Sequence, residues 1–269
     1  MKVLNGAELA LFVKERQARQ VRALRQAHKV FPKLVIIVAG ENPVIDTYVR
    51  LKQSYGEDIL IDVDVRQVAQ GDVAEEIKAA NDDPLVHGVI VQLPLPDVSQ
   101  TDDLVRRIAP EKDVDDLGMS GTFVAATAMA IDWLLAGYNV QLKERTIALV
   151  GKGRLVGAPL EKLWKNAGLN VTAYDDTETN LARQLRGADV IVTATGVPGL
   201  ITQAMVSPGK VVVDAGTASE NGVIKGDVSQ ALRDRGDVIL TPQKGGVGPL
   251  TVAALFDNVI TAAQKTVTR

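Results

Sequence analysis

The sequence predicts an α/β protein of two domains built on parallel sheets, and three observations lead to this prediction. Uninterrupted apolar runs, such as Leu34 to Ala39, are typical of strands that are covered on both faces. These runs alternate with segments of helical periodicity, as in successive βαβ units. Because 46% of the 269 residues are hydrophobic, the chain can also bury enough apolar surface for two cores.

The composition excludes several classes of protein. A net charge of −3 without a long basic run argues against nucleic acid as the main partner. The absence of cysteine excludes disulfides, thiolate catalysis and cysteine-ligated zinc. His28 and His87 lie far apart in the sequence, so we expect structural roles for both and no metal site. The N-terminus has no apolar signal core, and Leu34 to Ala39 is too short to cross a bilayer, so we expect a cytoplasmic protein without a membrane partner.

The first half of the chain alternates helices and strands. Asn5 and Glu8 have the spacing of a capping box, which predicts the start of the first helix. Asp72 is expected to cap a later helix through its side chain. The predicted elements, in order, are a helix over 7–28, a strand over 34–39, a helix over 44–55, a strand over 61–65, a helix over 73–81 and a strand over 86–91.

Polar groups in this half are candidates for a site. Tyr48 and Lys52 share one helix face, although a solvated lysine beside a half-buried tyrosine is the simpler interpretation of this pair. Gln92 follows a buried strand, at the edge where open α/β sheets bind ligands, and the prolines of Leu93 to Pro96 fix an extended wall beside it. Pro110 to Asp116 alternates carboxylates along an extended segment, which as ordinary loop charge would be solvated.

The second half begins with an alanine-rich apolar helix over 122–136, which suits a connection between domains. The strand over 147–150 then enters a glycine loop and a new helix, with the sequence Gly151-Lys152-Gly153-Arg154-Leu155-Val156-Gly157. Glycine permits positive φ and close backbone approach, and a helix N-terminus attracts phosphate, so this loop suits a pyrophosphate. Its spacing is one residue longer than the usual dinucleotide fingerprint and is weak evidence alone.

The segments after the glycine loop strengthen this interpretation. A strand within 169–176 ends in Asp175 and Asp176, where a Rossmann unit places its ribose-binding acid. Strands at 190–194 and 211–214 lead into turns that lie beside the expected cofactor and contain Thr195, Gly196 and Gly216. The second half is therefore predicted to be a Rossmann-like dinucleotide-binding unit.

A glycine-rich segment, Gly245-Gly246-Val247-Gly248-Pro249, lies near the end of the chain. Thr251 follows it and is the expected N-cap of a final helix. The segment is either a second site of close backbone approach or a hinge.

Five stretches occur in one order along the chain: Tyr48-Val49-Arg50-Leu51-Lys52, Val91-Gln92-Leu93-Pro94-Leu95-Pro96, Lys112-Asp113-Val114-Asp115, Gly151 to Pro159, and Gly245 to Thr251. This order resembles the bifunctional methylenetetrahydrofolate dehydrogenase/methenyltetrahydrofolate cyclohydrolase family over nearly the whole chain. The VQLPLP and GGVGP stretches are specific to that family, whereas the glycine loop is shared by many dehydrogenases.

The resemblance implies a homodimer that oxidises 5,10-methylenetetrahydrofolate with NAD or NADP and then hydrolyses the methenyl cation to 10-formyltetrahydrofolate. Tetrahydrofolate derivatives are the implied partners. The resemblance also implies a folate-binding, catalytic domain at residues 1–120, with 250–269 packing back on it, and a Rossmann-like NAD(P)-binding domain at 121–249.

The family pattern also implies roles for residues, by position. Tyr48 would pack against the folate ring, Lys52 would be the catalytic amine, and Gln92 would be its polar partner. Asp115 would hold the pterin, and further substrate contacts would come from Leu93, Pro94, Gly245, Gly246, Gly248 and Pro249. The cofactor would contact Gly151, Lys152, Gly153, Arg154, Val156, Gly157, Asp175, Asp176, Thr195, Gly196 and Gly216.

The chemistry of these side chains is compatible with the implied activity. Hydride departure leaves a cation that water attacks, and this step requires a general base. A lysine is normally protonated at neutral pH, but burial beside a cationic ligand lowers its pKa. Lys52 could then accept a proton from water, while Gln92 orients the amine without adding charge.

The chain departs from the family pattern on the substrate side. The family usually has serine at the position of Ile45, glycine at Asp116, Pro-Cys-Thr-Pro at 125–128 and Val-Pro at 243–244. These departures favour one alternative, a non-catalytic dinucleotide or folate sensor. A second alternative, a homologue that keeps only the cyclohydrolase step, would fit intact Lys52 and Gln92 beside the altered glycine loop. Retention of Lys52 argues against the sensor, because binding alone has little need for a positioned amine.

Asp176 would repel a 2′-phosphate and favours NAD, whereas Lys152 favours NADP.

Overall fold

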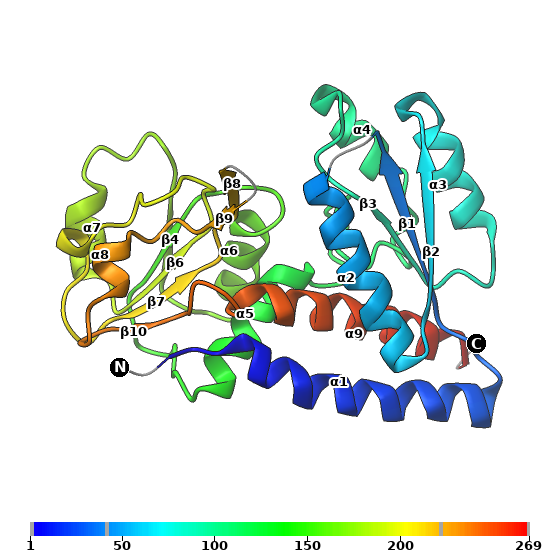
Figure 1. The fold of residues 1–269 in the computed structure, drawn as a ribbon, viewed down its shortest axis with the longest axis horizontal. Helices are drawn as coiled ribbons and strands as arrows, with labels where there is room; N and C mark the ends of the chain where they lie inside the picture. Colours follow the sequence, from blue (N-terminus) through cyan, green and yellow to red (C-terminus); the bar gives the residue numbers. More distant parts are fainter. Residues whose placement is uncertain (1–2, 41–42, 221–222, 268–269) are drawn as a thin grey trace. The chain divides into compact units, whose positions relative to one another are not determined.

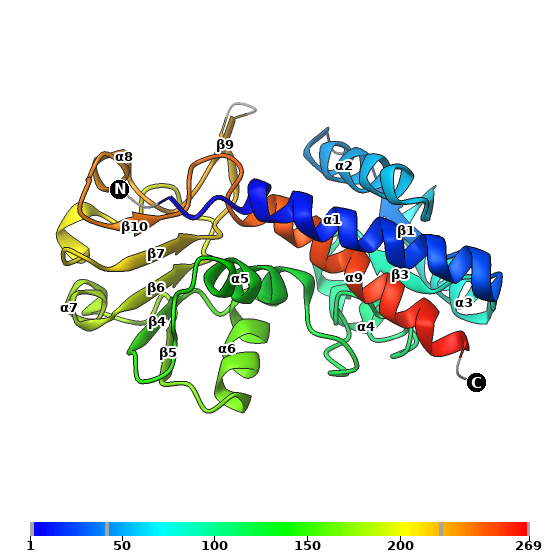
Figure 2. The same cartoon turned by 90° about the horizontal axis from the view of Figure 1, so that it is seen from below.

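The computed structural model describes residues 3–40, 43–220 and 223–267, and its sheets lie in two compact units (Figures 1 and 2). The five-stranded unit comprises Met1–Ala10 and Thr127–Thr251. The three-stranded unit comprises Leu11–Ala126 and Val252–Arg269. The predicted α/β class with parallel sheets is confirmed, and each unit is assembled from two separate stretches of chain.

The sheet of the three-stranded unit consists of β1 (Lys33–Ala39), β2 (Asp62–Val68) and β3 (Gly88–Val91). The strands are parallel in the order β2-β1-β3, and Ile36 of β1 pairs with Val65 on one side and Ile90 on the other. Central β1 is buried along nearly its whole length, which explains its unbroken apolar sequence. Because β2 and β3 flank β1, the carboxyl ends of β1 and β3 form a topological switch point, where such sheets bind ligands.

Several helices accompany the sheet of the three-stranded unit. They are α1 (Gly6–Ala23), which begins in the other unit and continues as a π-helical turn (Leu24–His28), α2 (Pro43–Ile59), α3 (Val73–Asp82), the short α4 (Thr101–Val105) and most of α9 (Val247–Val267). Nε2 of Gln17 in α1 donates to the carbonyl of Ala253 in α9 over 2.8 Å. Tyr55 of α2 stacks on Phe256 of α9, with ring centroids 5.1 Å apart. The final helix is therefore part of this unit, as predicted.

The sheet of the five-stranded unit contains only parallel pairs. Its strands are β4 (Ile147–Val150), β5 (Val171–Tyr174), β6 (Val190–Thr193), β7 (Val211–Asp214) and β10 (Ile239–Leu240), in the order β10-β7-β6-β4-β5. Counted along the chain this order is 2-1-3-4-5, one of the common doubly wound orders, with its switch point between β4 and β6. A Rossmann-like unit is confirmed. Its other elements are α5 (Ala126–Gly137), α6 (Gly157–Asn166), α7 (Leu181–Gly187), α8 (Gln230–Arg233) and an antiparallel hairpin of β8 (Ala218–Glu220) and β9 (Val223–Lys225).

Several predicted helix starts are wrong. Helix α9 begins at Val247, so Thr251 is not its N-cap but lies inside it, with Oγ1 donating to the Val247 carbonyl over 3.3 Å. Pro249 lies in the first turn, where its missing N–H costs no hydrogen bond. Helix α5 starts at Ala126 and not at residue 122. Asp72 precedes α3 without a side-chain capping bond, because a 3-10 turn (Gln70–Asp72) leads into that helix.

The capping box at the start of α1 forms only in part. Oδ1 of Asn5 accepts the amide of Glu8 over 3.3 Å, as predicted. The amide of Asn5, however, donates to the hydroxyl of Tyr138 over 3.0 Å, and that hydroxyl also donates to Glu8. A tyrosine far along the sequence therefore replaces the reciprocal bond.

None of the described helices is both long enough and apolar enough to span a membrane.

Candidate active site

Lys52 and Gln92 form the centre of the candidate site, at the switch point of the three-stranded sheet. Nζ of Lys52, from α2, donates to Oε1 of Gln92 over 2.8 Å. Gln92 directly follows β3, and its amide donates to the carbonyl of Ile37 in β1 over 2.8 Å. Its Nε2 donates to the carbonyl of Leu93 over 3.3 Å, which leaves the amide oxygen facing the amine. The sheet therefore fixes the acceptor that holds the Lys52 amine.

Two ionisable groups of this site have shifted pKa values. Burial lowers the pKa of the Lys52 amine, and attraction to the carboxylate of Asp115 offsets part of this shift. Burial raises the pKa of Asp115 to about 6, against the opposing effects of a hydrogen bond from Ala126 and the charge of Lys52. Both shifts disfavour the charged form of the group, as expected for groups removed from water. The simpler interpretation of Lys52 as a solvated lysine is therefore wrong.

The loop that carries Asp115 is fixed from two sides. Oδ1 of Asp115 accepts the amide of Ala126 over 2.8 Å. Nδ2 of Asn258, a buried residue of α9, donates to the carbonyls of Val114 and Val124, each over 2.8 Å. The sequence analysis missed Asn258, because a single asparagine within a helical stripe gives no signal of the two carbonyls that it will meet. Asn258 is thus the support of the Asp115 loop.

The remaining charged residues of the Lys112-to-Asp115 stretch have structural roles. Nζ of Lys112 donates to three carbonyls near the end of α3, those of Ala80, Asn81 and Asp83, at 2.6–2.9 Å. Asp113 is buried and accepts the amides of Leu117 and Gly118 over 2.9 and 2.8 Å. The interpretation of this segment as solvated loop charge is therefore wrong for Asp113. Burial raises the pKa of the Asp113 carboxyl to about 6.

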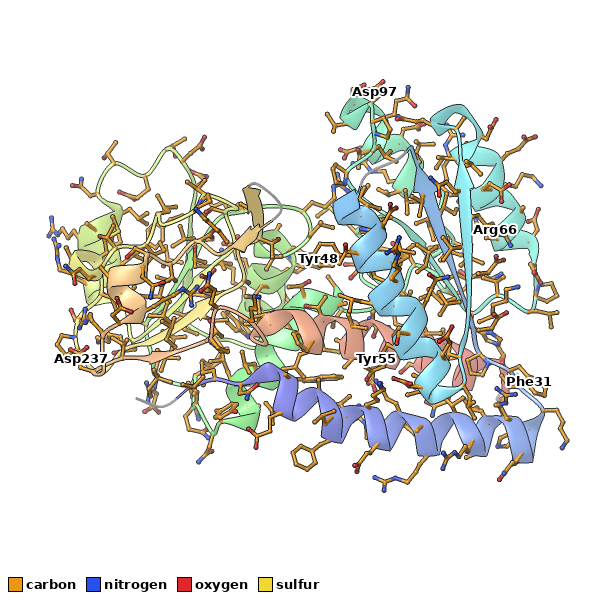
Figure 3. The ribbon with its side chains drawn as sticks, viewed as in Figure 1. Phe31, Tyr48, Tyr55, Arg66, Asp97 and Asp237 are labelled. Atoms are coloured by element: carbon orange, nitrogen blue, oxygen red, sulfur yellow. The ribbon has the colours of Figure 1, made fainter. Side chains whose placement is uncertain are left out.

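Tyr48, Leu93 and Pro94 belong to the same unit as Lys52. Tyr48 lies one turn before Lys52 on α2 and is partly buried (Figure 3). Leu93 is partly buried and Pro94 is exposed, and the peptide bond between them is cis. Asp116, where the family usually has glycine, adopts a φ of 50°, in the left-handed region that glycine favours. The Asp116 backbone therefore lies in a conformation that glycine adopts without strain.

In the five-stranded unit, Gly151 and Gly157 shape the predicted phosphate loop. Gly151 follows β4 with a φ of 99°, and a Cβ there would lie 2.5 Å from the carbonyl oxygen of Ala194. Gly157 is the first residue of α6, and a Cβ there would overlap the carbonyl of Gly151. Gly153 has open space where its Cβ would be. This close backbone fold leads directly into a helix N-terminus, as a pyrophosphate site requires.

Charged residues flank this loop. Nζ of Lys152 pairs with Oδ2 of Asp175 over 2.9 Å, and Oδ1 of Asp175 accepts both the amide and the hydroxyl of Thr177. Hydrogen bonds from Thr177 and Lys152 lower the pKa of Asp175 to about 2. Asp176 is exposed, and the two further loop residues of the predicted set, Arg154 and Val156, are partly buried. Asp175 is thus engaged within the protein, whereas Asp176 faces solvent.

The turns after β6 and β7 lie at the same edge of the sheet as the glycine loop. Thr195 follows β6, and its amide donates to Oδ2 of Asp227 over 2.7 Å. Gly216 follows β7, and its amide donates to Oδ1 of Asp214 over 3.1 Å. Gly196 has a φ of 70° and is exposed. The structure thus brings the predicted cofactor residues of this unit to one end of its sheet, and it adds Asp214 and Asp227, which the sequence analysis missed.

The glycine segment before α9 belongs to the five-stranded unit. Gly245 has a φ of 80°, and its carbonyl accepts the amide of Ala7 over 2.9 Å. Gly246 is buried so close to Gly6 that a Cβ on Gly6 would overlap the Gly246 carbonyl. Gly248 and Pro249 form the first turn of α9. The segment is therefore held by backbone packing against the start of α1.

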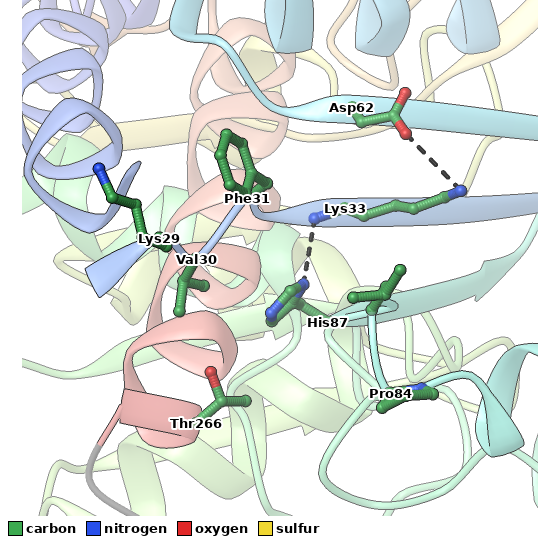
Figure 4. A pocket seen from close by; sticks show the side chains of 9 residues that line it. Lys29, Val30, Phe31, Lys33, Asp62, Pro84, His87 and Thr266 are labelled. Atoms are coloured by element: carbon green, nitrogen blue, oxygen red, sulfur yellow. Dashed lines mark hydrogen bonds and ion pairs between the residues drawn. The ribbon is translucent and has the colours of Figure 1, made fainter. Parts of the chain in front are cut away.

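A separate pocket of about 450 Å³ lies at the amino ends of the strands in the three-stranded unit (Figure 4). Its lining includes Lys33, Asp62 and His87, at or next to the first residues of β1, β2 and β3, whereas Gln92 lies at the carboxyl end. Lys33 pairs with Asp62 over 3.6 Å, and its amide donates to Nδ1 of His87 over 3.2 Å.

Within residues 3–40, 43–220 and 223–267, no cluster of histidine and acidic side chains could hold a metal ion.

Comparison with known proteins places the chain among folate enzymes. Residues 4–115 match the family described as the catalytic domain of tetrahydrofolate dehydrogenase/cyclohydrolase, and residues 125–267 match its NAD(P)-binding domain. The chain is 35% identical to the bifunctional protein FolD of Bordetella avium over 281 residues, covering 99% of both chains.

Solved structures agree with this match. The bifunctional FolD enzyme of Campylobacter jejuni superposes with a TM-score of 0.91 at 31% identity and 99% coverage of both chains. The Trypanosoma brucei enzyme, solved with NADP cofactor and inhibitor, gives a TM-score of 0.91 at 28% identity, covering 99% of this chain and 98% of the other. The chain belongs to the tetrahydrofolate dehydrogenase/cyclohydrolase family.

Proposed function

We infer that this protein oxidises 5,10-methylenetetrahydrofolate to the 5,10-methenyl cation with NAD or NADP, and hydrolyses that cation to 10-formyltetrahydrofolate. The observation that carries this inference is the Lys52–Gln92 pair, coupled to Asp115 at the switch point of the three-stranded sheet. An amine with a lowered pKa, held by an uncharged acceptor, suits proton transfer beside a cationic substrate. A protein that only binds folate would have little need for such an amine.

In the hydrolytic step, Lys52 acts as the general base. The neutral amine takes a proton from water as the water oxygen forms a bond to the methenyl carbon. The hydroxyl group formed on this carbon then loses its proton as its oxygen becomes the formyl carbonyl, the bond between the carbon and N5 breaks, and N5 takes up a proton. The formyl group stays on N10, and the proton taken by Lys52 is released to solvent. Gln92 accepts an N–H of the amine, so the nitrogen lone pair of neutral Lys52 is free to take the proton. Such positioned proton transfer typically contributes about 10²–10⁴ to the rate.

Asp115 and Tyr48 hold the substrate in this proposal. Oδ1 of Asp115 already accepts a backbone amide, which fixes the plane of the carboxyl group. Its other oxygen is then oriented to accept an N–H of the pterin. Tyr48 supplies a partly buried aromatic ring on the same helix face as Lys52 and packs against the folate ring. Leu93, Pro94 and the Gly245-to-Pro249 segment are proposed as further substrate contacts.

The five-stranded unit is proposed to bind the dinucleotide, which accepts a hydride from the substrate when it is bound. Its residues fit this role: the Gly151-to-Gly157 backbone leaves room for a pyrophosphate at the N-terminus of α6. The intact shape of this loop also argues against a homologue that keeps only the hydrolytic step. We propose that all the cofactor residues named from the family pattern contact the dinucleotide. We also propose residues 121–249 as the NAD(P)-binding domain, and residues 1–120, together with 250–269, as the folate domain.

We further propose NAD as the preferred cofactor. The Lys152 amine is paired with Asp175, so its charge is already balanced within the protein. The exposed carboxylate of Asp176 would repel a 2′-phosphate and would accept a hydrogen bond from a free ribose hydroxyl.

The proposed assembly is a cytoplasmic homodimer without a nucleic-acid partner. The family resemblance and the absence of a basic run support these points. Size-exclusion chromatography with light scattering would give the mass directly, and a mass near 28.7 kDa would rule out the dimer.

The decisive experiment supplies 5,10-methylenetetrahydrofolate with NAD or NADP and follows the absorbance of the methenyl product as it forms and decays. Formation tests the redox step, and decay faster than in enzyme-free buffer tests hydrolysis. A wild-type protein that accelerates neither step would contradict the proposal. Lys78→Ala, at an exposed lysine of α3, is the matched control for substitutions of Lys52.

A further inference from the structure

A buried acid, Asp227, lies at the carboxyl edge of the five-stranded sheet, and the mechanism above does not use it. Its side chain has 0% exposed surface. Oδ2 accepts the hydroxyl of Thr193 and the amide of Thr195, each over 2.7 Å. These residues lie at the end of β6 and in the turn that follows. Asp227 therefore holds the turn that leads into Gly196.

The Asp227 segment is itself fixed by a second buried acid, Asp214, the last residue of β7. The amides of Asp227 and Val228 donate to Oδ1 and Oδ2 of Asp214 over 3.0 and 3.1 Å. Arg233 of α8 forms an ion pair with the same carboxylate. These donors satisfy the hydrogen-bonding oxygens of the Asp214 carboxylate, so Asp214 fixes the position of the Asp227 backbone.

The second oxygen of Asp227 faces the other turn. Oδ1 is buried and has no hydrogen-bond partner among the described residues. A Cβ added to Gly216 would overlap this oxygen, so the Gly216 backbone passes directly over the carboxylate. Leaving a buried carboxylate oxygen without a donor costs stability. One side chain thus contacts the turn after β6 through hydrogen bonds and the turn after β7 through close packing.

We propose that Asp227 is a positioning residue for the dinucleotide site. It sets the spacing between the Thr195–Gly196 turn and the Gly216 turn, and it acts on the cofactor only through these turns. The proposal rests on the function inferred above, because both turns are proposed cofactor contacts. The three-stranded unit contains Lys52, Gln92 and Asp115, so hydrolysis of the methenyl cation does not depend on Asp227.

The first test compares wild type, Asp227→Ala and Asp227→Asn. We expect Asp227→Ala to raise the KM for the dinucleotide at least tenfold, while the KM for the folate substrate and the rate of methenyl hydrolysis stay within twofold. Asp227→Asn keeps an acceptor oxygen for the Thr195 amide, so it should restore the KM to within threefold of wild type. Fluorescence quenching of Trp133 and Trp164 by NADH measures cofactor binding without catalysis. An unchanged cofactor KM in Asp227→Ala, or parallel loss of hydrolysis, would overturn the proposal.

A double-mutant cycle with Gly216→Ala tests the packing contact itself. In the wild-type background the new methyl group collides with Asp227, and we expect a cofactor KM at least tenfold higher. In the Asp227→Ala background the methyl group has room, so the second substitution should add less than threefold. Additive effects would reject the contact. Failure of the wild-type protein to reduce NAD would instead reject the proposed function, so the two failures are distinguishable.

Discussion

The amine of Lys52 donates to the amide oxygen of Gln92 over 2.8 Å, so the partner of this buried lysine carries no charge. A carboxylate in the place of Gln92 would favour the ammonium form and raise the pKa of the lysine. The amide instead fixes the position of the nitrogen while burial lowers its pKa. Burial also raises the pKa of the nearby carboxyl group, Asp115, to about 6. In the proposed mechanism, this arrangement keeps the amine available as a base.

Replacing the amine should abolish hydrolysis selectively. Lys52→Ala is expected to slow decay of the methenyl cation by about 10²–10⁴-fold, because the general base is lost. Circular dichroism should show an unchanged fold, since removing a buried amine takes away a group that is costly to desolvate. The control Lys78→Ala should hydrolyse at the wild-type rate. Unchanged hydrolysis in Lys52→Ala would exclude this residue as the base.

The pH profile of hydrolysis should report the amine. The rate at saturating folate should rise with pH and level off as Lys52 loses its proton, with an inflection below the ordinary lysine value because burial lowers the pKa. Asp115→Asn removes an attraction that raises the pKa of Lys52, so the inflection should move to lower pH. An inflection that stays in place or moves upward in this variant would contradict the coupling.

The support of the Asp115 loop should matter for folate binding. Asn258→Ala leaves the carbonyls of Val114 and Val124 without their donor, and it is expected to lower the free energy of unfolding by about 1–3 kcal/mol. The KM for the folate substrate should rise several-fold, while the KM for the dinucleotide stays constant. Denaturant unfolding and steady-state kinetics measure both effects. Asn166→Ala, at an exposed asparagine, is the control, and an equal effect there would remove the case for Asn258.

Asp113 should make stability depend on pH in a specific direction. Its pKa is about 6 in the folded protein against 3.8 as the ordinary value, so the native state binds this proton more tightly than the unfolded state. The resulting stabilisation is fully present below about pH 4 and is lost as pH rises through about 6. The unfolding free energy of wild type, measured relative to Asp113→Asn, should fall by about 3 kcal/mol over this interval. A difference that is flat or rises with pH would refute the shift.

The exposed acid after β5 should set the cofactor preference. Asp176→Ser removes the charge that opposes a 2′-phosphate, and it is expected to raise kcat/KM for NADP about tenfold relative to that for NAD, which corresponds to about 1.4 kcal/mol. Asp82→Ser, in the other unit, should leave this ratio unchanged. If wild type already prefers NADP, or if Asp176→Ser leaves the ratio unaltered, Asp176 does not select the cofactor.

Much of the fold follows from local sequence, because buried parallel strands leave a direct signal. The run from Leu34 to Ala39 is apolar at every position since β1 is covered on both faces, and close backbone contacts require glycine at Gly151 and Gly157 after β4. Helix starts were less predictable. Helix α9 begins among glycines that resemble a loop, and the amide of Ala126 at the start of α5 is satisfied by Asp115, eleven residues earlier.

Predicting the site residues had a similar limit. Tyr48 and Lys52 have helical spacing, so their shared face follows from sequence alone. The roles of Lys112, Asp113 and Asn258 depend on partners brought together by folding, and no local pattern distinguishes a carboxylate that caps a turn from one that faces a ligand. The position at which β5 ends, Tyr174, likewise determines that Lys152 pairs with Asp175 and not with Asp176.

The order in which the ribosome makes this chain has a consequence for the three-stranded unit. Leu11–Ala126 is synthesised early, but Phe256 and Asn258, which complete the core of this unit and support the Asp115 loop, emerge only with the last helix. The nascent three-stranded unit is therefore incomplete until Thr127–Thr251, the main part of the five-stranded unit, has been translated. Premature termination before α9 would thus remove the support of a site whose Lys52, Gln92 and Asp115 side chains had already been made.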